Sequence, residues 1–182
     1  SKQQDTLQVD AIRFYVSDIQ IQFADNTFLK SDTSHLVDLE IPASQQIPLG
    51  LNNKKEIKKI IFSVGVDSLA CVSGALSGDL DPAKGMYWAW QSGYINMKIE
   101  GKSASCKTRK NQFQFHLGGY LKPYNALRTI ALEPKNSQTI NIALDLANFF
   151  SEVPLSQINS VMIPGKRAIQ LTNTSIKMFV VE

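Results

Sequence analysis

The sequence predicts an all-β domain in which two antiparallel sheets pack face to face as a β-sandwich, with long ordered loops and one or two short helices. Several short stretches place apolar residues at every second position, which is the period of a half-buried strand. Turn-forming residues separate these stretches at fairly regular intervals, and amphipathic helix patterns are few. An open α/β sheet is the weaker alternative.

One domain is expected to cover residues 1–182, because a chain of this length builds a single core. A long first strand is predicted between Val9 and Phe23, with a bend near Ser17 and Asp18. Further strands are expected at 35–41 and 58–66, where β-branched residues are frequent. The stretch 67–85 loses the alternation and is interpreted as a long ordered loop with at most one helical turn.

The second half of the chain begins with the clearest alternation, at 93–100, and continues with a strand at 112–117. In the latter, Gln112, Gln114 and His116 share one face and three apolar residues share the other. Two more strands are predicted at 128–133 and 138–146, joined by a turn at 134–137. Short helical pieces are expected at 147–150 and 155–159, and a strand or docked tail at 174–181.

Charge and hydropathy exclude several classes of protein. Hydrophobic residues make up 43% of the chain and charged residues 19%, as in a compact globule, and the net charge is +3. The two basic clusters are short and lack interleaved aromatic residues, so we interpret them as solvated surface and expect no nucleic-acid partner. They comprise Lys54, Lys55, Lys58 and Lys59, and Lys107, Arg109 and Lys110.

The chain carries no apolar run of about 20 residues, so no transmembrane segment is predicted. Ser1 begins a polar stretch, and we therefore expect a trimmed or mature chain from which an export signal is absent. Catalytic patterns are also missing: there is no Gly-x-Ser-x-Gly elbow, phosphate-binding glycine motif or recognised catalytic cysteine context. We predict that the protein is not an enzyme.

Asp79 and Asp81 lie two positions apart in a Gly- and Pro-containing loop. Calcium loops share this spacing, but the third oxygen ligand and terminal Glu of an EF-hand are missing. We expect both carboxylates to be structural and to accept hydrogen bonds from backbone amides of the loop. Calcium is the alternative.

The segment Met86–Tyr94 contains Trp88 and Trp90, the two tryptophans of the chain. Aromatic residues at this density usually pack a core, and a function becomes credible only beside a metal-capable side chain. His35 and His116 are the two histidines. Each alone is more often an ordinary hydrogen-bonded residue, but together with a soft or aromatic neighbour they would suit copper. The sequence leaves their proximity open.

Cys71 and Cys106 flank the strand predicted at 93–100. A disulfide between them would tie the loop before Met86 to the connection after Glu100, as an oxidising compartment permits. The alternative is a pair of thiols, at least one of them a buried small hydrophobe.

A series of motifs is spread over almost the whole chain. The longest is Gly85-Met-Tyr-Trp-Ala-Trp-Gln-Ser-Gly-Tyr-Ile95; the others are Arg13-Phe-Tyr-Val-Ser-Asp-Ile19, His35-Leu-Val-Asp-Leu39, Gly65-Val-Asp-Ser68, Ser73-Gly-Ala-Leu-Ser-Gly-Asp-Leu-Asp-Pro82, Lys98-Ile-Glu-Gly101 and Phe115-His-Leu-Gly-Gly-Tyr120. This series resembles the motifs of the MbnP-like family of copper-binding proteins.

The resemblance implies a β-sandwich in the periplasm or at the cell surface, often a lipoprotein with its lipid anchor upstream. It implies a non-catalytic protein that holds or takes up copper, with His35 and His116 as ligands. Trp88 or Trp90 would correspond to the tryptophan that is oxidised to kynurenine in some relatives. Together with Met86, the two tryptophans would form the wall of the metal site. The partners would be copper and an outer-membrane or periplasmic protein. The alternative is a metal-free surface lipoprotein domain that binds a protein or glycan.

Overall fold

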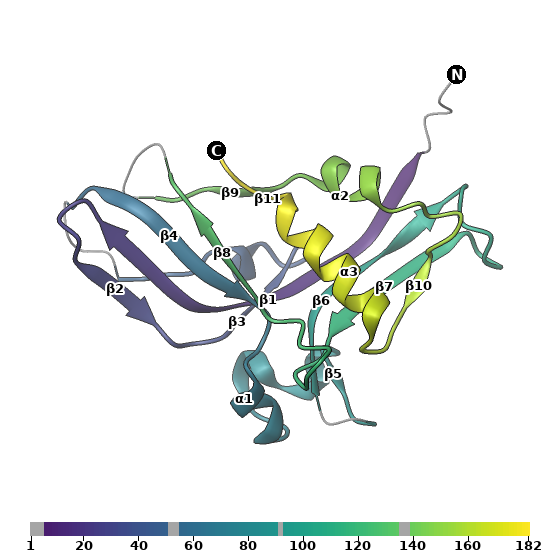
Figure 1. The fold of residues 1–182 in the computed structure, drawn as a ribbon, viewed down its shortest axis with the longest axis horizontal. Helices are drawn as coiled ribbons and strands as arrows, with labels where there is room; N and C mark the ends of the chain where they lie inside the picture. Colours follow the sequence, from purple (N-terminus) through teal and green to yellow (C-terminus); the bar gives the residue numbers. More distant parts are fainter. Residues whose placement is uncertain (1–5, 51–54, 91–92, 135–138) are drawn as a thin grey trace.

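The computed structural model describes residues 6–50, 55–90, 93–134 and 139–182 (Figure 1). The described strands form a nine-stranded sheet and a separate two-stranded pair, β9 with β11. The mostly β architecture is therefore confirmed. The strands are β1 (Leu7–Phe23), β2 (Phe28–Ser31), β3 (His35–Asp38), β4 (Ile57–Val64), β5 (Tyr87–Trp88), β6 (Gly93–Ser103), β7 (Gln112–Gly118), β8 (Arg128–Leu132), β9 (Ile142–Leu144), β10 (Ser160–Val161) and β11 (Phe179–Val181).

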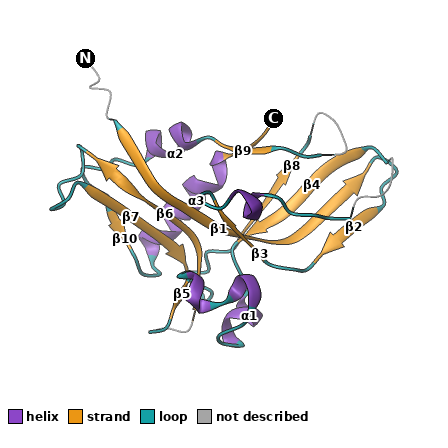
Figure 2. Ribbon diagram, turned by 180° about the vertical axis from the view of Figure 1, so that it is seen from behind, coloured by secondary structure: helices purple, strands orange, loops and turns teal. Residues whose placement is uncertain are grey.

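Strand β1 runs through both halves of the large sheet. Arg13 and Phe14 pair with β3 along one edge of β1 and with β6 along the other. Val16 pairs with β3 and with β4, so β4 continues along the edge that β6 has left. The halves β6–β7–β10 and β4–β8 then diverge, as Figure 2 shows. Two separate facing sheets are not confirmed, because one strand belongs to both halves.

The divergence coincides with the bend predicted in β1. Asp18 has a φ of 50°, and the register with β4 shifts between Ser17 and Gln20. At the same level, Gly65 has a φ of +120°, and a Cβ on this residue would lie 2.4 Å from Cγ of Asn96. The Asn96 side chain accepts a hydrogen bond from the amide of Val66 at 3.2 Å, which joins the two halves. Only glycine fits at position 65.

The faces of the sheet carry two different hydrophobic clusters. The main core receives Phe113, Phe115 and Leu117, each fully buried, which confirms the alternation predicted for β7. Helices α2 (Leu146–Glu152) and α3 (Lys166–Ser175) contribute to this core. The second group, here called the aromatic cluster, lies under the segment 66–90 and comprises Tyr15, Leu36, Val66, Cys71, Met86, Trp88, Tyr94 and Ile95.

Helices exceed the one or two that were predicted. The long loop was expected to hold at most one helical turn, but it contains the helix α1 (Ser68–Val72) and two 3-10 helices. Helix α2 includes the helical piece predicted at 147–150. Helix α3 was missed because its sequence is rich in Thr, Ser and Asn, which disfavour helix interiors. The buried hydroxyl of Thr172 donates to the carbonyl of Ala168 at 2.9 Å, so the helix tolerates this polar side chain. The 3-10 helices are Pro42–Gln45, Gly78–Leu80, Pro82–Lys84 and Ile176–Met178.

Other predicted boundaries at the C-terminal end were partly wrong. The stretch 155–159 forms turns, not a helix, and 174–181 contains the end of α3, a 3-10 helix and β11. The strand predicted at 138–146 is only β9, and residue 138 and most of the turn predicted at 134–137 lie outside the described residues. None of the helices in the described part of the chain has the length and apolar character needed to cross a membrane.

Candidate metal and ligand site

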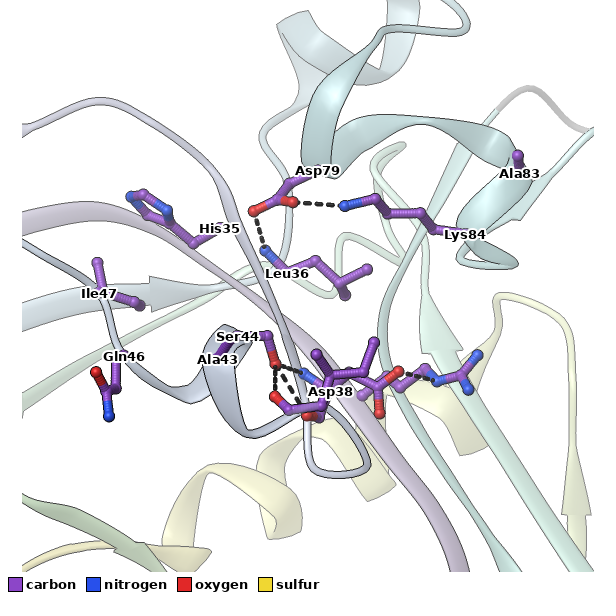
Figure 3. A pocket seen from close by; sticks show the side chains of 12 residues that line it. His35, Leu36, Asp38, Ala43, Ser44, Gln46, Ile47, Asp79, Ala83 and Lys84 are labelled. Atoms are coloured by element: carbon purple, nitrogen blue, oxygen red, sulfur yellow. Dashed lines mark hydrogen bonds and ion pairs between the residues drawn. The ribbon is translucent and has the colours of Figure 1, made fainter.

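His35 lines a cavity of about 590 Å³ at the edge of the sheet (Figure 3). The cavity lies between β3, the 3-10 helix Pro42–Gln45 and the loop segment Asp79–Lys84. His35 is half-buried at the start of β3. The residues that line the cavity are Arg13, His35, Leu36, Asp38, Ile41, Ala43, Ser44, Gln46, Ile47, Asp79, Ala83 and Lys84.

Both loop carboxylates, of Asp79 and Asp81, accept hydrogen bonds. Asp79 accepts a hydrogen bond from the amide of Leu36 at 3.0 Å and from Nζ of Lys84 at 2.6 Å. Burial raises the pKa of Asp79, but these two bonds outweigh it and hold the pKa below its usual value. Asp81 accepts from the amide of Ala83 at 2.8 Å and caps a 3-10 helix. Asp81 therefore binds an amide of its own loop, whereas the amide that Asp79 binds belongs to β3, outside the loop.

The other charged groups of the cavity are also paired. Nε of Arg13 lies 2.8 Å from Oδ2 of Asp38, and its Nη2 donates to Glu40 at 2.9 Å. Of the titratable side chains that line the cavity, all within the described part, His35 alone has no hydrogen bond or ion pair. Its imidazole is therefore the group left to meet a ligand there.

His116 has a different environment, on β7 and only 7% exposed. Its Nε2 lies 2.6 Å from Oε1 of Glu100 on the neighbouring strand β6. Burial lowers the pKa of His116, and the bond with Glu100 opposes this only in part. Burial therefore favours the neutral ring, the form that binds metals, and a carboxylate on one nitrogen is a common way to orient a ligand histidine.

The register of the sheet separates the two histidines. His116 pairs with Lys98, Lys98 with Arg13, and Arg13 with Asp38 of β3. Three strand spacings of about 4.8 Å give about 14 Å between Asp38 and His116, and His35 lies further along β3. Two imidazoles share a metal only when their nitrogens lie within about 4 Å, since each metal–nitrogen bond is about 2 Å. The predicted proximity is therefore not found.

The tryptophans occupy contrasting positions. Trp88 is 6% exposed and Trp90 is 63% exposed, and their ring centroids are 5.9 Å apart. A Cβ on Gly118 would lie 2.8 Å from the Trp88 ring, which places Trp88 two residues along β7 from His116. Met86 is fully buried in the aromatic cluster. Gln91 and Ser92, within the same motif, lie outside the described residues.

The predicted disulfide is absent, although both cysteines are described residues. Cys71 belongs to the aromatic cluster and Cys106 to the main core, so the sheet lies between them. Flanking one strand in the sequence did not bring them together, because they pack against opposite faces. Burial raises the pKa of the Cys71 thiol, as in an unreactive small hydrophobe.

The donor set does not fit a single copper site that takes both histidines. No group of three or more His, Cys, Asp and Glu side chains within the described ranges could hold a metal ion. Glu100 and Lys84, which fix His116 and Asp79, were not among the residues predicted from the sequence. For Glu100 a signal existed: it and His116 occupy outward positions of adjacent strands.

Fold and site together define a mostly β domain with an edge cavity and a loop-covered aromatic cluster. This chain belongs to the MbnP family: the family model of that description matches residues 1–163. A solved structure of MbnP from Methylosinus trichosporium superimposes with a TM-score of 0.56 over 81% of this chain and 68% of that one, at 16% identity, and shows a similar fold. No curated protein matches the chain.

Proposed function

We propose that this protein is a non-catalytic, extracytoplasmic copper-binding member of the MbnP family that takes up or holds copper as cargo. The observation that carries the proposal is the family match over residues 1–163. The same proposal places the protein in the periplasm or at the cell surface, tethered by a lipid anchor upstream, with an outer-membrane or periplasmic protein as its partner.

The two histidines support the proposal as separate copper-binding groups. His116 is hydrogen-bonded to a carboxylate and its burial favours the neutral ring, and His35 lies on a cavity without a hydrogen bond or ion pair to any described residue. Imidazole is a good ligand for copper in either case. Because about three strand spacings separate them, each histidine contributes independently to copper binding, and neither needs the other.

Copper content measured by elemental analysis tests the proposal. The protein is purified without chelator, reconstituted with copper, washed and compared with the variants His35→Asn, His116→Asn and the double variant. We expect copper on the wild type, a partial loss in each single variant and the sum of both losses in the double variant. Equal copper on the wild type and the double variant would contradict the role of the histidines.

Complete loss in both single variants would instead indicate one shared site, and would show that the strands rearrange around the metal. Intact mass of the same wild-type sample, with Trp88→Phe and Trp90→Phe as controls, shows whether a tryptophan is oxidised to kynurenine. We expect any modification at Trp90, because it is exposed and Trp88 is buried.

A metal-free domain that binds a protein or glycan is the second candidate. It is favoured by large apolar side chains exposed on loops near β5, of which Trp90 is 63% and Leu121 67% exposed. Wild-type protein that holds no copper after reconstitution would support this candidate.

A further inference from the structure

A second, smaller cavity lies at the β10 edge of the large sheet, where the turn between β6 and β7 meets the segment that leads into β10. Its volume is about 310 Å³. Arg109 and Lys110, from a basic cluster predicted to be solvated surface, are among its lining residues. The lining residues are Thr108, Arg109, Lys110, Gln112, Gln114, Asn159 and Ser160.

The turn that carries the two cations is held by its own hydrogen bonds. The amide of Asn111 donates to the carbonyl of Thr108 at 3.0 Å, which makes Arg109 and Lys110 the central residues of a β-turn. The Thr108 hydroxyl donates to the carbonyl of Gln112 at 2.9 Å. Cys106, only 2% exposed, anchors the same connection in the main core. Both cationic side chains therefore start from a fixed backbone.

The floor of the cavity supplies neutral hydrogen-bonding groups. Gln112 and Gln114 lie on the outward face of β7, and Ser160 pairs in parallel with Gln114. The amide of Gln114 also donates to the carbonyl of Asn159 at 2.9 Å, which fixes β10 against β7. Amide and hydroxyl side chains from two elements thus face the same space as the cations.

The nearby carboxylates are already engaged. Glu100, opposite Gln114, lies 2.6 Å from His116, and Asp10 pairs with Lys102 at 3.8 Å. Within the described residues, no carboxylate lines the cavity, and neither Arg109 nor Lys110 forms an ion pair. Two unneutralised cations beside amide and hydroxyl donors suit a ligand with several negative oxygens.

We propose that this cavity binds a tetrahedral oxyanion, namely a phosphate group, free or as a monoester of a small molecule. Arg109 and Lys110 supply the charge, and the side chains of Gln112, Gln114 and Ser160 supply further hydrogen bonds. The site is independent of copper, because neither histidine lines it.

Titration of the whole chain with inorganic phosphate and with glycerol 3-phosphate, followed by backbone amide NMR, tests the proposal. We expect saturable shift changes confined to residues 108–114 and 159–160. The variant Arg109→Ala/Lys110→Ala should weaken binding about ten- to a hundredfold, since hydrogen bonds to charged groups are the strong ones. Tighter binding of glycerol 3-phosphate than of phosphate would identify an ester as the ligand, and the reverse order would identify the free ion.

The matched control is Lys30→Ala/Lys58→Ala, which removes the same charge from exposed positions of β2 and β4. It should bind phosphate as the wild type does. Equal weakening in both double variants, or shift changes that are not saturable, would mean general charge screening and would overturn the site. Thermal unfolding of both variants checks that they remain folded.

Discussion

The two faces of the large sheet bury side chains in different ways. The main core fills the space between the sheet and helices α2 and α3, with strand residues at every second position. The aromatic cluster on the other face is covered by the long segment 66–90, which contains one short α-helix and two 3-10 helices. The main core therefore joins the sheet to the helices, whereas the aromatic cluster holds one loop against the sheet.

The largest expected effect is in the main core. Phe115 is fully buried and stacks with Phe113 at a centroid distance of 5.8 Å. The variant Phe115→Ala should lower the free energy of unfolding by about 3–5 kcal/mol, because it leaves a cavity in the sheet–helix interface. Denaturant unfolding measures this loss. A change below about 1 kcal/mol would contradict a dominant contribution of the main core to the stability of the fold.

A somewhat smaller effect is expected in the aromatic cluster. Met86→Ala removes a fully buried side chain and should cost about 2–4 kcal/mol. Because this cluster mainly secures the segment 66–90, the substitution should speed amide hydrogen exchange there more than in β7. The control Met162→Ala, at a position 40% exposed, should change stability by less than about 0.5 kcal/mol. Uniform acceleration over all strands would contradict a local role.

A single hydroxyl of the aromatic cluster gives the next prediction. The Tyr94 hydroxyl donates to the carbonyl of Leu80 at 2.8 Å and accepts from the amide of Leu76 at 3.3 Å. Tyr94→Phe leaves a backbone amide and carbonyl without these partners and should cost about 1–2 kcal/mol. Thermal unfolding measures the shift. Tyr124→Phe, at a position 42% exposed, is the matched control and should unfold as the wild type does.

The smallest expected effect is the pH dependence contributed by His116. Because burial lowers the pKa of His116 in the folded protein, the unfolded chain takes up the proton first as the pH falls. The contribution of His116 to the free energy of unfolding is therefore fully present above the ordinary histidine pKa of about 6.5. It is lost as the pH falls toward the lower pKa of His116 in the folded protein.

Urea unfolding between pH 7.5 and 5.5 measures this dependence. Stability of the wild type should fall toward pH 5.5, and His116→Asn should flatten the profile. The variant His35→Asn should keep the pH dependence of stability that His116 contributes in the wild type. A wild-type profile that rises on acidification would mean that the ion pair with Glu100 outweighs burial.

The sequence by itself determined what depends on short-range pattern. The long bent β1, the alternation of β7 and the loop between β4 and β6 follow from side-chain period and from Gly, Asp and Pro, which act on neighbouring residues. The motif series also identified the family. Helix α3 escaped prediction because its buried Thr172 and Ser175 form hydrogen bonds within the helix, which the residue types alone do not reveal.

Only the tertiary structure decided which of the predicted site residues lie close together. Cys71 and Cys106 flank one strand but lie on opposite faces, because the two connections pack into different clusters. His35 and His116 belong to β3 and β7, and the pairing order of β3, β1, β6 and β7 sets the distance between them. Strand order depends on contacts between residues far apart in the chain, and periodicity within one strand carries no information about it.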